Sequence, residues 1–151
     1  MNYRLYKKEK LCSKTAIDRL FEARLTKGAF TDDGRGRVGV GLCYPLRAVF
    51  AENRVRGGAP VQFLISVPKK RLRRAVDRVT MRRRIREAYR LNRFWNEADD
   101  RRHPLSAKVD VAFIYVANEL VPYQRVQRAV QRLLDTIYNS LSVIEKGDEE
   151  T

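Results

Sequence analysis

The residues of this 151-residue chain best suited to chemistry are basic side chains gathered in one segment. Positions 69–93 hold twelve basic residues against two acidic ones, so this segment carries +10 of the net charge of +14. Ten of the twelve are arginines, whose planar guanidinium groups match phosphate oxygens two at a time. A face that only solvates a helix usually mixes both signs of charge. The segment therefore indicates a polyanionic partner, such as nucleic acid or an acidic membrane surface.

Residues that could support catalysis are few. The one histidine, His103, stands among arginines and a proline in a predicted loop, which does not suit nucleophilic catalysis. Paired carboxylates at Asp32–Asp33 and Asp99–Asp100 could hold magnesium in a protein nuclease, but neighbouring positions need a third ligand to converge on one ion. Cys12 and Cys43 stand 31 positions apart, which suits neither a zinc site nor a disulfide framework. We expect no catalytic residue and no metal ligand in this chain.

A helix over residues 74–94 would position the basic side chains, because neither Gly nor Pro interrupts residues 71–102. At about 100° per residue, five arginines share one sector of the helix and four apolar residues fill the sector beside it. The apolar stripe would pack while the basic stripe binds, and we expect Asp77 and Glu87 to lie away from the basic stripe without neutralising it. The arginines are Arg82, Arg83, Arg86, Arg90 and Arg93, and the apolar residues are Met81, Ile85, Ala88 and Tyr89.

Several short apolar, β-branched segments are predicted to be strands. The segment 108–116 is apolar on both faces, which is typical of a central strand. The segments 46–51 and 61–67 are separated by a turn-rich stretch and are expected to pair as a hairpin. Residues 27–37 read as a loop, and 38–42 as a short edge strand.

Two further helices complete the predicted domain. Ser13 can cap a short helix that ends near position 24 or 25, and an amphipathic helix covers residues 122–143. Strands interleaved with helices predict a two-layer α/β sandwich of the α+β type. We expect one domain over residues 1–145 and a polar tail over 146–151. No segment has the apolar length of a membrane span or of a secretory signal.

Residues 66–90 also follow a specific order of residue types: Ser-x-x-basic-Lys, a basic-Ala-Val step, an Arg, a basic pair and an Arg-Glu close. The matching positions are Ser66, Lys69, Lys70, Arg74, Ala75, Val76, Arg78, Arg82, Arg83, Arg86, Glu87 and Arg90. This pattern resembles the signature of the bacterial ribonuclease P protein component. The chain departs from the signature at the central Arg-Asn-Arg triplet, which reads Arg78-Val79-Thr80.

The resemblance implies a small mixed sheet of about four strands with three helices, and a basic helix in a left-handed βαβ crossover, an exception to the usual hand. It also implies a ribonucleoprotein endoribonuclease that removes the 5′ leader from precursor tRNA. The RNA subunit would catalyse the cleavage with Mg²⁺, and the chain itself would hold no cofactor. The expected partners are the catalytic RNA and precursor tRNA, in a 1:1 complex with a monomeric protein in the cytoplasm.

The resemblance further assigns roles to particular residues. The single-stranded leader would lie in a cleft between the first helix and the sheet, where Phe21 with Phe113 or Tyr115 could stack on bases. Ordinary core packing is the alternative for these aromatics. Leu11 stands where an aromatic residue is expected. The residues implied to bind RNA are Lys69, Lys70, Arg74, Arg78, Arg82, Arg83, Arg86 and Arg90.

Three other functions compete with this interpretation. The composition alone also suits a structural RNA-binding protein of the ribosomal type with no role in cleavage. A protein nuclease using its own carboxylates would cleave RNA without an RNA subunit. Membrane binding is disfavoured, because the basic helix lacks the wide Leu, Phe and Trp face needed for insertion.

Overall fold

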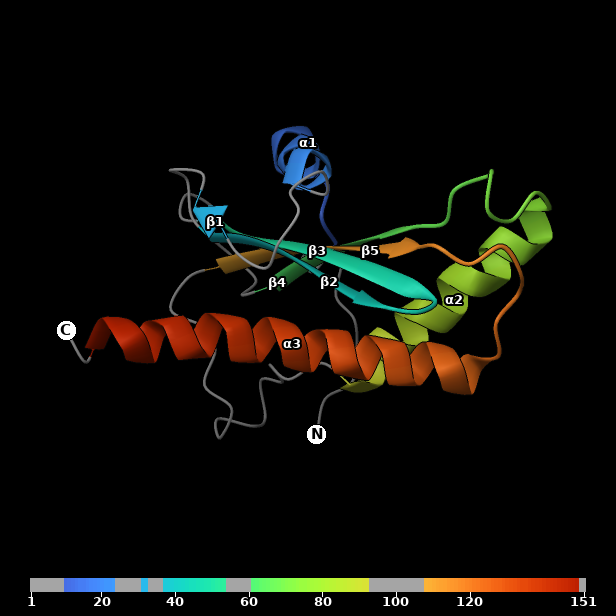
Figure 1. The fold of residues 1–151 in the computed structure, drawn as a ribbon. Helices are drawn as coiled ribbons and strands as arrows, with labels where there is room; N and C mark the ends of the chain where they lie inside the picture. The colour runs from blue at the N-terminus through green and yellow to red at the C-terminus, as the bar shows by residue number, and fades with distance from the viewer. Residues whose placement is uncertain (1–9, 24–30, 33–36, 54–60, 93–107, 150–151) are drawn as a thin grey trace.

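The computed structural model describes residues 10–23, 31–32, 37–53, 61–92 and 108–149. In this part of the chain, a mixed sheet lies between the short helix α1 on one face and the helices α2 and α3 on the other (Figure 1). The predicted α+β class, with three helices and a small mixed sheet, is confirmed. The elements are α1 (Lys14–Ala23), β1 (Thr31–Asp32), β2 (Arg37–Cys43), β3 (Leu46–Asn53), β4 (Val61–Ser66), α2 (Ala75–Asn92), β5 (Lys108–Tyr115) and α3 (Tyr123–Glu149).

The strands lie in the order β1-β2-β3-β5-β4, and only the β4–β5 pair is parallel. Strands β2 and β3 form a hairpin. They are connected by a tight turn at Tyr44 and Pro45, and the peptide bond between these two residues is cis. The predicted hairpin between residues 46–51 and 61–67 is wrong. The physical reason is β5, which is buried on both faces and is inserted between β3 and β4.

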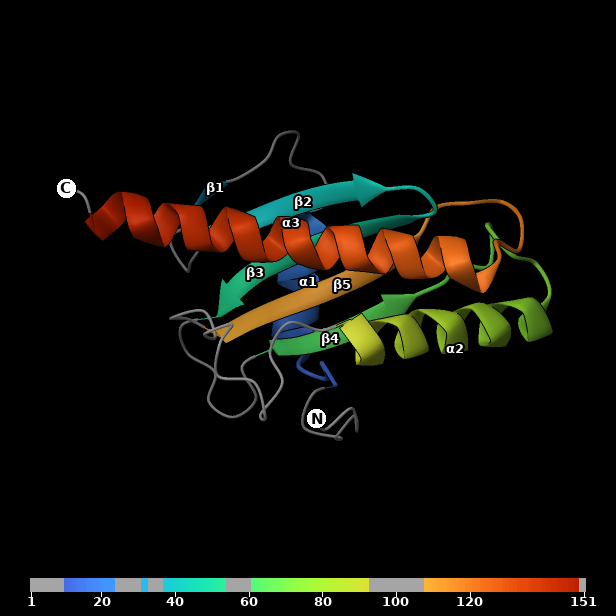
Figure 2. The same ribbon diagram turned by 90° about the horizontal axis from the view of Figure 1, so that it is seen from below.

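The connection from β4 through α2 to β5 is left-handed. In Figure 2, α2 lies in front of the sheet, and β4 and β5 are parallel and point to the right. Because β5 lies above β4 in this view, the path from β4 through α2 to β5 turns in the left-handed sense. Such crossovers are rare, because the twist of the strands favours the opposite hand. The crossover brings α2 beside α3 on the same face of the sheet.

Two apolar clusters hold the helices against the sheet. The larger one joins α2 and α3 to the sheet through large side chains such as Phe50, Phe113 and Tyr115, all at most 1% exposed. The smaller one joins α1 to the opposite face through Leu20 and Val49. Gly39 leaves room for the Phe50 ring, since a Cβ at that position would lie 2.4 Å from the ring Cζ.

Most predicted helix positions agree with the structure. Ser13 caps α1, with its hydroxyl oxygen accepting a hydrogen bond from the N–H of Ala16 at 3.4 Å. The predicted basic helix is α2, although residues 93 and 94 lie outside the described part. The last helix is longer than predicted and continues to Glu149, which takes it into the segment predicted to be a polar tail.

Candidate nucleic-acid interface

Helix α2 sits on the sheet through the apolar stripe that its sequence predicts. Met81, Ile85, Ala88 and Tyr89 are all completely buried. The Tyr89 ring stacks on Phe63 of β4, with centroids 4.0 Å apart. This packing fixes the rotation of α2 about its axis, so the basic residues must point away from the sheet.

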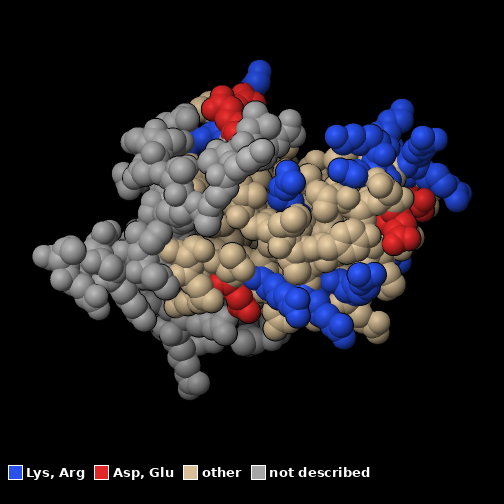
Figure 3. All heavy atoms as spheres, viewed as in Figure 1, with Lys and Arg blue, Asp and Glu red and all other residues tan. Residues whose placement is uncertain are grey.

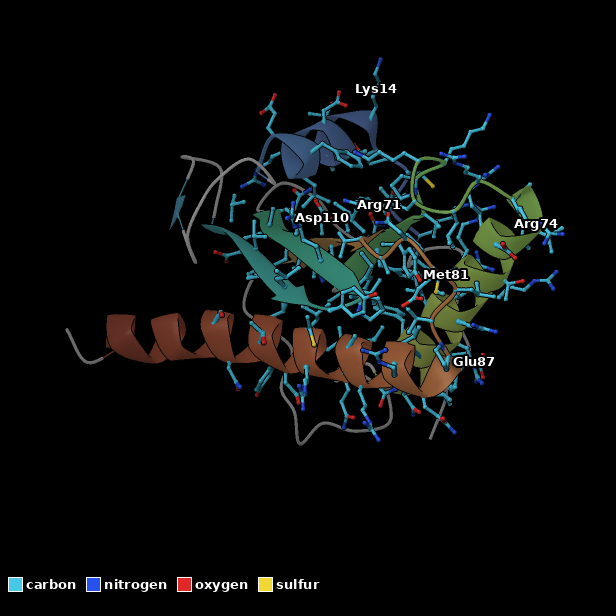
Figure 4. The ribbon with its side chains drawn as sticks, turned by 45° about the vertical axis from the view of Figure 1, so that its right-hand side comes forward. Lys14, Arg71, Arg74, Met81, Glu87 and Asp110 are labelled. Carbon is cyan, nitrogen blue, oxygen red and sulfur yellow. The ribbon has the colours of Figure 1, made fainter. Side chains whose placement is uncertain are left out.

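Basic side chains gather at two places on the face seen in Figure 3, one near the start of α2 and one along α3. The first gathering includes the 68–74 loop, where Lys69, Lys70 and Arg74 are exposed. Figure 4 shows Arg74 at the N-terminal end of α2, pointing away from the body, while Met81 points toward the sheet. Farther along α2, Arg83 and Arg86 are exposed and Arg82 is half-buried. The α2 basic surface is hereafter Lys69, Lys70, Arg74, Arg82, Arg83 and Arg86.

Arg78 has a structural contact that the sequence pattern did not reveal. Its Nη1 donates hydrogen bonds to the carbonyl oxygens of Leu72, at 2.9 Å, and Arg73, at 2.8 Å. Leu72 is buried, and its N–H donates to the carbonyl of Pro68. Arg78 therefore fixes the loop that presents the first three members of the α2 basic surface.

Arg90 is paired with an acid of its own helix. Its Nη2 lies 2.6 Å from Glu87 Oε1, and its Nε donates to Oε2 at 3.1 Å. These hydrogen bonds hold the pKa of the Glu87 carboxyl below its ordinary value, so the pair stays ionised at neutral pH. The expectation that Glu87 leaves the basic stripe unneutralised is thus wrong at Arg90, because residues three apart meet on a helix surface.

Two grooves border α2. One, of about 560 Å³, lies between α2 and the start of α3 and is lined by Arg83, Arg84, Arg86, Glu87 and Tyr123. Burial raises the pKa of the Tyr123 hydroxyl, which therefore remains a neutral potential donor at physiological pH. Arg84 also links α2 to the segment that leads into α3, since its Nη1 donates to the Val121 carbonyl at 2.7 Å.

The second groove, of about 450 Å³, separates the 68–74 loop from the loop that follows β5. Arg71 spans this groove, with its Nη1 donating to Asn118 Oδ1 at 3.1 Å. The carboxylates of Asp77 and Glu119 also line it, so this groove is less favourable for an anion than the exposed side of α2.

The predicted stacking of Phe21 with Phe113 or Tyr115 is contradicted by their positions. Phe113 and Tyr115 are completely buried among residues of α2 and α3, whereas Phe21 is half-buried on α1, across the sheet. The Tyr115 hydroxyl donates to the Glu119 carbonyl and accepts from the Val121 N–H, and burial raises its pKa. Because a buried ring has no face open to a base, these two residues belong to the core.

The α1 side of the sheet offers other side chains that sequence reasoning did not select. Four residues of the α1 side are half-buried, one on each of four strands: Val40, Arg47, Leu64 and Ile114. Leu42, farther along β2, is 68% exposed. In the sequence, these residues alternate with the core residues of the same strands, and this alternation could have shown that they share one face of the sheet. It does not show which of the two faces is covered by helices. Leu11, at the position expected to be aromatic, is buried and donates its N–H to the Phe63 carbonyl at 2.9 Å.

Within the described ranges, no three His, Cys, Asp or Glu residues lie close enough to hold a metal ion. Cys12 and Cys43 are both free thiols. His103, Asp33 and the Asp99–Asp100 pair lie outside the described residues. Among the helices that are described, none combines the length and the apolar character needed to cross a membrane.

Comparison with known proteins identifies the family. The sequence profile of the family described as Ribonuclease P matches residues 45–138. Ribonuclease P protein components from two strains of Porphyromonas gingivalis are 39% and 40% identical over 101 and 104 residues. Each alignment covers 67% of this chain and 71% of the relative.

A solved structure of the Staphylococcus aureus RNase P protein has a similar fold. It superposes with a TM-score of 0.58 over 85% of this chain and 94% of that protein, at 15% identity. A mutant of the same protein, described as defective in mRNA degradation activity, gives a TM-score of 0.54. The profile match, the sequence relatives and the shared fold agree, and the chain therefore belongs to the family of ribonuclease P protein components.

Proposed function

We propose that this protein binds the catalytic RNA of ribonuclease P through the α2 basic surface and assists removal of the 5′ leader from precursor tRNA. In this proposal the RNA subunit performs the Mg²⁺-dependent cleavage, and the protein supplies binding and positioning. One monomeric protein joins one RNA, and the complex acts in the cytoplasm.

The observation that carries the proposal is the set of six cations in the α2 basic surface. Among the described residues, none of the six is within ion-pair distance of a carboxylate, while Arg78, Arg84 and Arg90 are engaged with protein acceptors. Several unpaired like charges on one face repel each other, and phosphates relieve that repulsion. Each phosphate neutralised also releases a counterion, which adds to affinity and makes binding salt-dependent.

The precursor tRNA leader is proposed to lie on the opposite side of the sheet, beside α1. Phe21 and Ile114 are half-buried there, and Leu42 is exposed. A half-buried aromatic residue and apolar groups on the side of the sheet that also carries Arg47 suit unstacked bases and their phosphates without sequence specificity. Phe113 and Tyr115 have no part in this site.

The test is cleavage of precursor tRNA by the cognate catalytic RNA at low Mg²⁺, with and without the protein, plus a reaction containing protein alone. We expect strong stimulation by the protein and no cleavage by protein alone. Tight RNA binding without stimulation would favour a structural RNA-binding protein instead. Cleavage by protein alone would overturn the assignment of catalysis to the RNA.

A further inference from the structure

Helix α3 carries a second set of cations that the α2 basic surface does not include. Arg125, Arg128 and Arg132 are exposed, and their spacing of three and four residues places them on one side of the helix. With a rise of about 1.5 Å per residue, the row is about 10 Å long. The core stripe of the same helix, which includes Val126, Val130 and Leu133, faces away from this row.

None of the three arginines has a carboxylate within ion-pair distance among the described residues, although Asp135 lies one turn beyond Arg132. Arg125 instead lies over the ring of Tyr44, in the β2–β3 turn, at 5.5 Å from the ring centroid. Tyr44 is 50% exposed. Unpaired arginines beside an exposed aromatic ring are typical of nucleic-acid-binding surfaces.

The row is separate from the α2 basic surface. Arg125 lies over Tyr44 of the β2–β3 turn, and Thr136, on the same side of α3 as the row, approaches Gly41 of β2, so the row borders the part of the sheet formed by β2. The start of α3 meets α2 on its other side, where Tyr123 lines the groove with Arg83 and Arg86. Figure 3 shows the two gatherings of basic side chains separated by uncharged surface and by acidic side chains.

We propose that the arginine row of α3, Arg125, Arg128 and Arg132, binds the sugar–phosphate backbone of the catalytic RNA at a segment distinct from the one on α2. This inference rests on the proposed function. The row lies on the helical side of the sheet, as α2 does, and not on the α1 side proposed for the leader. One RNA can therefore contact both surfaces, while the substrate occupies the opposite face.

The experiment compares a triple variant, Arg125→Gln, Arg128→Gln and Arg132→Gln, with the wild-type protein in binding to the catalytic RNA over a series of salt concentrations. We expect affinity at moderate salt to fall at least about tenfold, and the slope of log K against log salt to become shallower by about two to three. The matched control is Gln124→Ala with Gln131→Ala, which changes two exposed residues of the same helix without changing charge.

A second triple variant, with lysine at the three positions, checks that charge is responsible. It should keep most of the salt slope, because lysine also neutralises phosphate. Circular dichroism and thermal unfolding of each variant confirm that α3 is intact. Since the three side chains are exposed, we expect no loss of helix.

Two results would overturn the inference. One is a glutamine variant whose slope of log K against log salt is the same as that of the wild-type protein. The other is a variant that assembles normally with catalytic RNA but binds precursor tRNA more weakly in the holoenzyme, which would assign the row to the substrate. Failure of the wild-type protein itself to bind the catalytic RNA would instead remove the proposed function, so the two failures are distinguishable.

Discussion

The arginines of α2 divide into two groups by what their guanidinium groups contact. Arg78 and Arg84 donate to backbone carbonyls, and Arg90 is paired with Glu87. Arg82 and Arg86 have no such partner among the described residues. Fewer arginines of α2 are therefore available to bind RNA than the number of arginines in its sequence suggests.

At Arg82 and Arg86, replacement by alanine should weaken binding to the catalytic RNA. Each variant removes one phosphate contact, so the slope of log K against log salt should become shallower by about one unit. Affinity measured from low to moderate salt checks this. Lys14→Ala is the control, because Lys14 is exposed on α1 across the sheet and is not expected to contact the catalytic RNA. An unchanged slope would place Arg82 and Arg86 off the RNA.

Phe21 and Phe113 should respond differently to replacement by alanine. Phe113 is completely buried, so Phe113→Ala should lower the free energy of unfolding by about 3–5 kcal/mol. Phe21 is half-buried, and we expect Phe21→Ala to reduce mainly the affinity of the holoenzyme for precursor tRNA with a long leader. Urea unfolding and KM for substrates of two leader lengths separate the effects. Equal loss of affinity for both leader lengths would contradict leader contact by Phe21.

At the scale of elements, local patterns were predictable and pairings between distant segments were not. The 3.6-residue repeat of Met81, Ile85 and Tyr89 is a local property, and it fixed the buried side of α2 correctly. The partner of β4 depends on β5, which follows more than 40 residues later, so chain proximity suggested the wrong hairpin. Because β5 is apolar on both faces, its sequence pattern does not predict on which face Phe113 lies, and only the structure shows that it faces α2 and α3.

The 68–74 loop is the element most dependent on one side chain. Replacing Arg78 with alanine removes two hydrogen bonds from a charged donor to the carbonyls of Leu72 and Arg73, so we expect a loss of about 1.5–3 kcal/mol in the free energy of unfolding. Amide exchange in the loop should also become faster, and RNA affinity should fall as Lys69 and Lys70 lose their fixed positions.

Urea unfolding and hydrogen exchange followed by mass spectrometry measure these effects. A matched variant is Arg73→Ala, which removes an exposed neighbouring arginine but keeps the carbonyl contacts. Loss of RNA affinity in Arg78→Ala with unchanged stability and loop exchange would show that Arg78 acts by contacting RNA directly.

At the scale of the whole molecule, the sheet separates two basic surfaces on its helical side from a more apolar surface on its α1 side. The helical side presents the α2 basic surface and the arginine row of α3, and the α1 side presents half-buried apolar side chains with Arg47. The left-handed crossover matters here, because it places α2 beside α3 on one face. A partner with phosphates on one side and unpaired bases on the other matches this division.

From the net charge of +14 we expect anions to stabilise the folded state. Compaction brings the cations of α2 and α3 together, and their repulsion lowers stability unless bound anions relieve it. Sulfate, which presents phosphate-like oxygens, should stabilise the protein more than chloride at equal ionic strength. At a hundredfold excess over its Kd, an anion that binds only the folded state adds about 2.7 kcal/mol. For a chain of this length, that gain corresponds to an increase of about 5–10 °C in Tm.

Site-specific binding and general screening are separable in this experiment. The combined variant Arg82→Gln with Arg86→Gln removes two members of the α2 basic surface, so it should start from a higher Tm in chloride and gain less from sulfate. A variant that gains as much from sulfate as the wild-type protein would mean that sulfate acts by its general exclusion from protein surfaces. The difference between sulfate and chloride therefore reports whether the basic surface is an anion site in the absence of RNA.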